Sequence, residues 1–398
     1  MRCFILYIAV LLPILLLSGC GQQQSRTNLN SQKLPSEPSI TLNEVAIVES
    51  FGDHYFSGLH TPILTENGEL ILRDFNAQML FRISADGELL QTIGRDGRGP
   101  GEFQSIHSMV MAPGDTLHVF DYNNMRQQLF AIENNEWSPA RELHRKRPSG
   151  ATPGLNYFQP NSVFEVNNEL MGLFQNQIVP GDSATMYHSW LARLDSNLNP
   201  LDDEKILLKP SENAMVIAIT GGMLVNSHPF SYRLFRAWNP AEQLLAEVSN
   251  ADGVLRLYRA DGQEVRAIQL PFEKAEPDDA ARNEYEQEIA RDHGNDIARE
   301  ARQKSLPHEP LISNFLIDNE GRYWLHMNRL EEDNPNWIVF GADGELLGSF
   351  LLTWNWDEGA MTRPLLVHKN RIYALHYYDY EPSLRIYDIS FDHAVSGE

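Results

Sequence analysis

From Leu42 onward, hydrophobic and polar residues alternate over short runs, and Gly, Asn and Asp separate these runs. This pattern is typical of short β-strands joined by tight turns. The clearest unit has apolar runs at residues 62–64, 69–74, 80–83 and 89–93. Asn67-Gly68 lies between the first two runs and Asp86-Gly87 between the last two, and both dipeptides favour hairpins. The unit therefore predicts one four-stranded antiparallel sheet with the size of a propeller blade.

Similar units recur along the rest of the chain, at residues 109–132, 162–208, 232–268, 315–350 and 365–388. The last unit is one strand short, while the strand-like residues 45–49 have no partner before the first unit. We therefore expect an all-β fold, a six-bladed β-propeller in which the N-terminal strand closes the last blade and protects its edge. A β-sandwich or a tandem of barrels also has many short strands, but it does not repeat a blade-length unit.

Residues 273–304 do not follow the strand pattern. They are rich in Glu, Asp, Arg and Ala, and Pro277 precedes Asp278 at an acidic helix start. Gly294 interrupts the segment, so we expect one helix or two short ones inserted between blades 4 and 5. The insertion is either a lid over one mouth of the ring or a solvated surface feature.

The N-terminus has the features of an export signal. Met1-Arg2 is followed by an apolar run at residues 4–17, which is shorter than the roughly twenty residues that span a bilayer. Leu17-Ser18-Gly19-Cys20 then resembles the lipobox of bacterial lipoproteins. The resemblance implies that residues 1–19 are a signal peptide, removed when Cys20 receives its lipid. Several acyl chains hold a protein firmly on a membrane.

Gly21 follows the cysteine, and the resemblance then favours the outer membrane, because an Asp there retains many such proteins in the inner membrane. The following residues are polar with few apolar side chains, so we expect residues 20–41 to be a flexible tether. The propeller would occupy residues 42–392.

Composition limits the functions that remain. The chain has 398 residues and a formal net charge of −22, which disfavours binding to nucleic acid. Its two cysteines, Cys3 and Cys20, both lie in the N-terminal segment, so the folded body has neither a disulfide nor a thiolate metal site. We expect a monomer.

The most distinctive run is Ile93-Gly94-Arg95-Asp96-Gly97-Arg98-Gly99-Pro100-Gly101-Glu102-Phe103. It resembles the glycine-rich linker of NHL-type propellers and, together with the lipobox, the six-bladed propeller lipoproteins of Bacteroidetes. Its glycines allow positive φ angles and close backbone approach. We expect Glu102 to lie near the face where inner strands begin, either bonded to the backbone of this loop or available to a ligand.

Polar residues at or near predicted inner-strand starts are the candidate ligand-binding set: Glu102, His107, Asn161, His228, Asn314 and Arg363. They could form the polar lining of a wet channel. Alternatively, the two histidines could bind zinc and Asn161 or Asn314 calcium, as in metal-dependent lactonases of this fold class. Trp354 and Trp356 are candidates for stacking against a sugar or a peptide.

We therefore expect an exported lipoprotein with a non-enzymatic binding propeller, without an obligatory cofactor. Its ligand would be a small molecule, a glycan or a partner protein at one mouth of the ring. The alternative is a calcium- or zinc-dependent hydrolase or lactonase that uses the axial channel. A third possibility is a subunit of an outer-membrane nutrient-uptake assembly.

Overall fold

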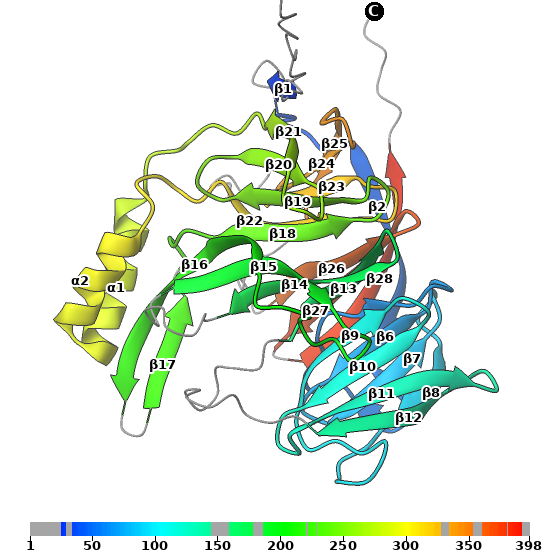
Figure 1. Cartoon of the computed structure of the whole chain (residues 1–398). Coiled ribbons are helices and arrows are strands. Elements are labelled where there is room, and N and C mark those ends of the chain that lie inside the picture. The colour runs from blue at the N-terminus through cyan, green and yellow to red at the C-terminus, as the bar shows by residue number, and fades with distance from the viewer. Residues whose placement is uncertain are drawn as a thin grey trace, which may run out of the picture.

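The structure, a computed structural model, describes residues 25–28, 34–144, 159–177, 186–219, 222–227, 229–327, 334–352, 360–379 and 381–391. These residues form six large antiparallel sheets, each one blade of a β-propeller (Figure 1). The all-β, six-bladed prediction is therefore confirmed. Predicted features outside these ranges, namely Cys20, His228, Trp354 and Trp356, lie outside the described residues.

Blades 1 to 3 follow one another along the chain. Blade 1 has strands β5 (Ile63–Leu64), β6 (Leu70–Asp74), β7 (Met79–Ile83) and β8 (Leu89–Ile93). Blade 2 has β9 (Ile106–Ala112), β10 (Thr116–Asp121), β11 (Arg126–Glu133) and β12 (Glu136–His144). Blade 3 has β13 (Ser162–Val166), β14 (Glu169–Gln177), β15 (Met186–Leu194), β16 (Ile206–Ile219) and β17 (Gly222–Ser227).

Blades 4 to 6 complete the ring. Blade 4 has β18 (Leu234–Asn239), β19 (Leu244–Ser249), β20 (Val254–Tyr258) and β21 (Glu264–Gln269). Blade 5 has β22 (Ile312–Ile317), β23 (Tyr323–Met327), β24 (Trp337–Phe340) and β25 (Leu346–Phe350). Blade 6 has β26 (Ala360–His368), β27 (Arg371–Tyr378), β28 (Glu381–Phe391) and β2 (Ile40–Val48), and a small hairpin of β3 (Ser50–Phe51) and β4 (His54–Tyr55) follows β2.

The N-terminal strand β2 pairs antiparallel with β28, from Ile40 opposite Phe391 to Val48 opposite Leu384. It is the outer strand of blade 6, and Figure 1 shows it, in blue, beside the red C-terminal strand. The two ends of the propeller domain are thus joined by a backbone ladder, which leaves no open sheet edge at β28.

Apolar clusters lie between consecutive blades all the way around. Six such clusters join blade 1 to 2, 2 to 3, 3 to 4, 4 to 5, 5 to 6 and 6 to 1. The cluster between blades 6 and 1 packs Phe81 and Leu70 against Leu375 and Ile386. Because blade 1 is covered on both faces, its middle strand β6 is buried throughout, whereas its outer strand β8 is largely exposed.

Part of the segment 20–41, predicted as a flexible tether, contacts the propeller in the described residues. Strand β1 (Ser25–Asn28) pairs parallel with the outer strand β21. The N–H of Ser39 also donates to the carbonyl of Ser349 at 2.9 Å, and Ile40 is buried. An outer strand offers unpaired backbone groups, and an extended segment can pair with them whatever its side chains are.

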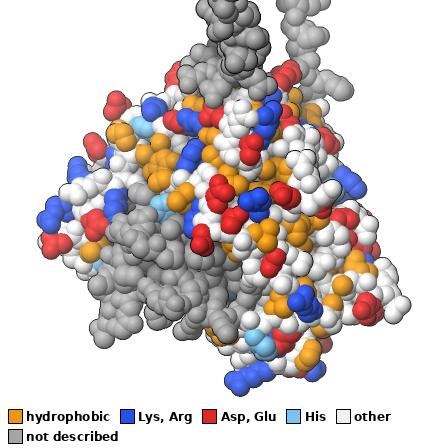
Figure 2. Space-filling view, in the orientation of Figure 1, with side chains coloured by type: hydrophobic (Ala, Val, Ile, Leu, Met, Phe, Trp, Pro, Cys, Tyr) orange, Lys and Arg blue, Asp and Glu red, His pale blue; other side chains and the backbone are white. Residues whose placement is uncertain are grey.

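Two helices, α1 (Asp279–His293) and α2 (Asn295–Lys304), separate blades 4 and 5 in the chain. The Asp278 side chain caps α1, and Gly294, with φ 94°, ends it. Figure 1 shows the pair, in yellow, on the outside of the ring beside β16 and β17. On the face shown in Figure 2, acidic and basic side chains are interspersed, with hydrophobic side chains scattered among them.

Candidate functional site

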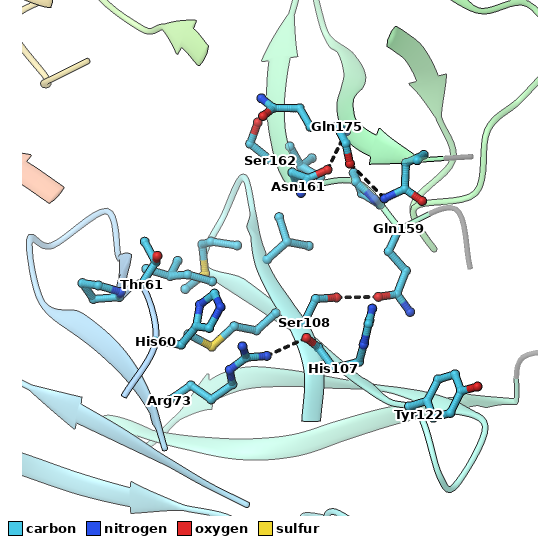
Figure 3. A pocket seen from close by; sticks show the side chains of 18 of the residues that line it. His60, Thr61, Arg73, His107, Ser108, Tyr122, Gln159, Asn161, Ser162 and Gln175 are labelled. Carbon is cyan, nitrogen blue, oxygen red and sulfur yellow. Dashed lines mark hydrogen bonds between the residues drawn. The ribbon is translucent and has the colours of Figure 1, made fainter. Parts of the chain in front are cut away.

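A cavity of about 890 Å³ opens near the start of the first strands of blades 1 to 3. These strands, β5, β9 and β13, contact one another in sequence around the ring, so they line its inner side. Blade 6 contributes Arg363 to the same cavity. Figure 3 shows the residues from the three blades facing a shared space. Neither α1 nor α2 contributes a lining residue, so the helices do not cover this opening.

Most of the lining carries hydrogen-bonding side chains. The polar lining consists of His60, Thr61, Arg73, His107, Ser108, Tyr122, Gln159, Asn161, Ser162, Gln175, Gln177, Tyr187 and Arg363. None of the described lining residues is Asp or Glu. A site of this composition can form many hydrogen bonds to a ligand and offers it no negative charge.

His60 and His107 occupy corresponding positions in blades 1 and 2. The N–H of Phe75 donates to the carbonyl of Gly58 at 2.9 Å, and the N–H of Tyr122 donates to the carbonyl of Ser105 at 2.8 Å. Each histidine lies two residues beyond the accepting carbonyl. The fold thus repeats a cavity-facing position, and the sequence places a histidine at it in both blades.

Asn161 holds the matching place in blade 3. Its N–H donates to the carbonyl of Leu173 at 2.7 Å, just as the N–H of His60 donates to the carbonyl of Arg73 at 3.0 Å. The Oδ1 atom of Asn161 accepts a hydrogen bond from the N–H of Gln175 at 2.6 Å, which fixes its amide at the cavity wall (Figure 3). Three successive blades therefore present His, His and Asn to the same space.

The walls are tied together across blades. One guanidinium nitrogen of Arg73, Nη1, donates to the carbonyl of His107 at 2.6 Å and to that of Ile106 at 3.3 Å. The hydroxyl of Ser108 bonds the side chain of Gln159 (Figure 3). Blade 1 is thus held to blade 2, and the segment before blade 3 to blade 2, by polar contacts around the cavity.

Burial and neighbouring positive charge keep the cavity histidines neutral. Burial, and then the charges of Arg73 and Arg363, lower the pKa of His60 to about 4. Burial and then Arg73 lower the pKa of His107 below its usual value. Both side chains still face the open cavity and are accessible there. At neutral pH each ring therefore offers one N–H donor and one nitrogen acceptor to a ligand.

The two arginines differ in accessibility. Burial lowers the pKa of Arg73 to about 10, and the side chain is only 6% exposed. Burial also lowers the pKa of Arg363, although this side chain is exposed toward the cavity. Both remain charged at neutral pH, so the cavity has positive charge in one wall and a second cation within a ligand's reach.

Glu102 lies outside the cavity lining. Its carboxylate accepts hydrogen bonds from the N–H groups of Arg98 and Gly99, at 3.0 and 2.7 Å, and pairs with Arg95 at 2.7 Å. These bonds lower its pKa, the bond from Gly99 most of all, with that from Arg95 next. A Cβ on Gly97 would stand 2.2 Å from the Glu102 carboxylate, so this approach requires glycine. Glu102 thus binds its own loop.

The other predicted residues divide between the cavity and the rest of the chain. His107, Asn161 and Arg363 come together in the lining, whereas Asn314 does not belong to it. The Oδ1 atom of Asn314 accepts a hydrogen bond from the N–H of Phe315 at 2.9 Å. His228, Trp354 and Trp356 lie outside the described residues.

Sequence reasoning missed His60 and Arg73. His60 lies just before β5, and His107 lies near the start of β9. Different turn lengths in the two blades hide from the sequence that these two positions are equivalent. Arg73 directly follows the apolar run 70–72 within one strand. A charged residue in a strand that is buried on both faces is unusual, and it could have indicated a functional position. Only the fold shows that Arg73 and Arg363, which are 290 positions apart, share one cavity.

The described residues contain no cluster of three or more His, Cys, Asp or Glu side chains that could hold a metal ion. Zinc sites use His, Cys and carboxylate ligands, and calcium sites combine carboxylates with carbonyl oxygens and water. The two guanidinium groups in the cavity also repel a divalent cation. Of the predicted calcium or zinc ligands, His107 and Asn161 line the cavity, Asn314 does not, and His228 lies outside the described residues.

Comparisons with known proteins do not assign the chain to a family. No protein-family model and no curated protein matches the chain. Among solved structures, it is similar to a protein of Bacteroides fragilis described as exported, with a TM-score of 0.49 and 10% identity over 92% of this chain and 99% of the other. It is also similar to a gluconolactonase of Xanthomonas campestris, with a TM-score of 0.41 and 13% identity over 90% and 97% of the two chains.

A virginiamycin B lyase of Staphylococcus aureus is a third neighbour, with a TM-score of 0.38 and 10% identity over 88% of this chain and 99% of the other. At these levels of identity and superposition the neighbours carry no information about function. Within the described residues, no helix is both long enough and apolar enough to cross a membrane.

Proposed function

We propose that this protein is an exported, lipid-anchored binding protein whose propeller takes a small polar ligand into the cavity without catalysing a reaction. The observation that supports it best is the cavity itself, where His60, His107 and Asn161 face one space from corresponding positions of three blades. Ligand sites are concave and carry a few polar groups that converge on the ligand. A volume of about 890 Å³ accommodates a molecule the size of a mono- or disaccharide.

The metal-dependent hydrolase is the weaker alternative, because protein sites for catalytic divalent ions usually include carboxylate ligands that balance the charge of the ion. The described lining has no carboxylate, and its two arginines oppose a cation. The hydroxyl of Ser108 bonds a glutamine amide, which cannot act as a general base. We therefore propose binding as the main activity.

The envelope location rests on the lipobox-like run that ends at Cys20. We propose lipid attachment there, at the outer membrane, with an outer-membrane partner as a further possibility. In the producing bacterium, Cys20→Ser should move the full chain from the membrane fraction to the soluble fraction and abolish labelling with a palmitate analogue. Unchanged fractionation and labelling of this variant would contradict lipid anchoring.

The binding proposal can be tested by filling the cavity. The full chain, purified in detergent, would be screened by thermal unfolding against sugars, sugar acids, amino acids and dipeptides. At a hundredfold excess over Kd, a ligand stabilises the folded state by about 2.7 kcal/mol. We expect at least one ligand to stabilise the wild type, with the shift lost in Ser162→Trp, which places an indole in the cavity.

Thr92→Trp is the matched control, because Thr92 is exposed on the outer strand β8. This variant should keep the ligand shift. A screen with no ligand, or a shift that survives Ser162→Trp, would contradict the proposal. Calcium or zinc binding by calorimetry, together with turnover of an added lactone, would instead support the hydrolase.

A further inference from the structure

Five arginines are buried in the described part of the chain, and four of them have carboxylate partners. Arg82 pairs with Glu69, Arg126 with Asp121 and Glu142, Arg236 with Glu247, and Arg322 with Asp318. The N–O distances range from 2.5 to 3.4 Å. Arg73 is the fifth, and no carboxylate of the described residues lies within ion-pairing distance of it.

Asp74, the carboxylate next to Arg73 in sequence, binds other partners. Asp74 follows Arg73 on β6, and consecutive side chains of a strand point to opposite faces. The Asp74 carboxylate accepts hydrogen bonds from the backbone N–H of Ser57 and of Asn76, at 3.0 and 3.2 Å, and contacts His54 at 3.1 Å. It is therefore committed to the loop before β5, on the side away from Arg73.

Arg73 has only neutral partners among the described residues. Its Nη1 atom donates to two backbone carbonyls, and its buried Nε atom has no hydrogen-bond partner there. Carbonyl groups stabilise a guanidinium but do not cancel its charge. A buried charge without an opposite charge is costly, and an anionic ligand beside it would reduce that cost.

Arg363 brings a second positive charge to the same space. Arg73, Arg363 and His60 all line this one cavity. The described lining contains no Asp or Glu. The chain as a whole has a net charge of −22, so its bulk acidity does not explain a cationic cavity.

We propose that the ligand of this cavity carries an anionic oxygen group, a carboxylate, phosphate or sulfate, which lies within the field of Arg73 and is contacted by Arg363. This inference rests on the proposed binding function and specifies its ligand class. His60, His107 and Asn161 supply neutral donors and acceptors beside the charges, and such groups suit hydroxyls. The chemistry that fits best is a hydroxylated acid such as a sugar acid.

The test compares ligands that differ by one charged group. Calorimetric titrations of the full chain would use glucuronate and glucose, which share a ring and differ at a carboxylate, together with inorganic phosphate and sulfate. Glucuronate should bind at least tenfold more tightly than glucose. Arg363→Gln should weaken glucuronate binding about ten- to hundredfold, the loss expected for a hydrogen bond between charged groups.

Two further variants guard against indirect effects. Arg299→Gln removes the same charge from an exposed side chain of α2 and should leave the affinity unchanged. Arg73→Lys keeps the wall charge and should retain more affinity than Arg73→Met. Thermal unfolding of every variant verifies that it is folded. If Arg73→Met does not fold, the inference is tested by Arg363→Gln, which changes an accessible position.

Equal affinity for glucose and glucuronate would overturn the inference, and so would an unaffected Arg363→Gln. Failure of all three anionic probes to bind saturably would overturn it as well. These results leave the binding proposal standing if the screen finds a neutral ligand that Ser162→Trp excludes. If neither the screen nor the anions show binding, both proposals fail.

Discussion

Arg236 and Arg73 are both buried arginines of a propeller blade, but their surroundings are opposite. Arg236 lies at the junction of blades 3 and 4, where it donates to Glu247 at 2.9 and 2.6 Å and to the carbonyls of Ser189 and Leu207. Lys209 adds a second cation to Glu247 at 2.7 Å. Arg73 has two carbonyls and, within the described chain, no carboxylate.

If the proposed anion site is correct, the difference separates a structural from a ligand-binding use of one side chain. Around Arg236 the charges are balanced within the protein, because the ion pair with Glu247 compensates for burying the guanidinium. Around Arg73 the charge is left open toward a cavity with accessible polar groups. The same contrast applies to the glycine-rich linker, where Arg95, Arg98 and Gly99 fully occupy the Glu102 carboxylate.

The largest expected effect is the loss of stability when the Arg236–Glu247 ion pair is removed. Arg236→Met should lower the free energy of unfolding by about 3–5 kcal/mol, because it leaves Glu247 buried with a single cation. Denaturant unfolding of the full chain measures this. Arg299→Met, at an exposed position, should change the value by less than about 0.5 kcal/mol. A loss of unfolding free energy below about 1 kcal/mol for Arg236→Met would contradict the structural role that distinguishes Arg236 from Arg73.

Acidification should destabilise the fold through buried neutral histidines. Burial lowers the pKa of His326 to about 4, whereas the unfolded chain titrates near 6.5. Between these values the unfolded state binds more protons, so the free energy of unfolding falls as the pH falls from 6.5 to 4. The contribution of His326 is about 3 kcal/mol over this window.

Denaturant unfolding at several pH values checks this, with His326→Asn as the comparison. Between pH 6.5 and 4, the free energy of unfolding should fall less steeply in the variant than in the wild type. Identical pH profiles for the two proteins would show that His326 is not a buried neutral group in the folded state.

Arg73→Met should have a smaller effect on stability than Arg236→Met. The substitution removes hydrogen bonds to two carbonyls, but it also removes a buried charge that has no opposite charge. We expect the free energy of unfolding to change by less than about 1.5 kcal/mol, measured in the same denaturant series. A loss as large as that of Arg236→Met would mean that Arg73 is mainly structural.

The smallest expected effect concerns the linker. Because the Glu102 carboxylate is bound within its own loop and lies outside the cavity lining, Glu102→Gln should leave the glucuronate affinity within about twofold of wild type. Calorimetry measures it beside Arg363→Gln. A tenfold change would connect the linker to the cavity and break the separation between the two regions.

Much of the fold was readable from local patterns. Asn67-Gly68 and Asp86-Gly87 marked hairpins that the structure contains, with positive φ angles at both glycines. The long hairpin of β16 and β17 was missed, although Gly221-Gly222 separates its two apolar runs. The pairing of β1 with β21 was also missed, because a polar extended segment has no periodicity that reveals its partner.

The sequence by itself determined the blade repeat, the acidic charge, the lipobox-like run and the presence of polar residues near inner-strand starts. These features are local, since alternation, turn residues and composition act over a few neighbours along the chain. Only the tertiary structure decided which polar residues meet. Ring closure brings Arg363 of blade 6 to His60 and Arg73 of blade 1, while Asp74, adjacent to Arg73 in sequence, faces other partners. Charge balance at a site depends on distances in space, and sequence separation does not determine them.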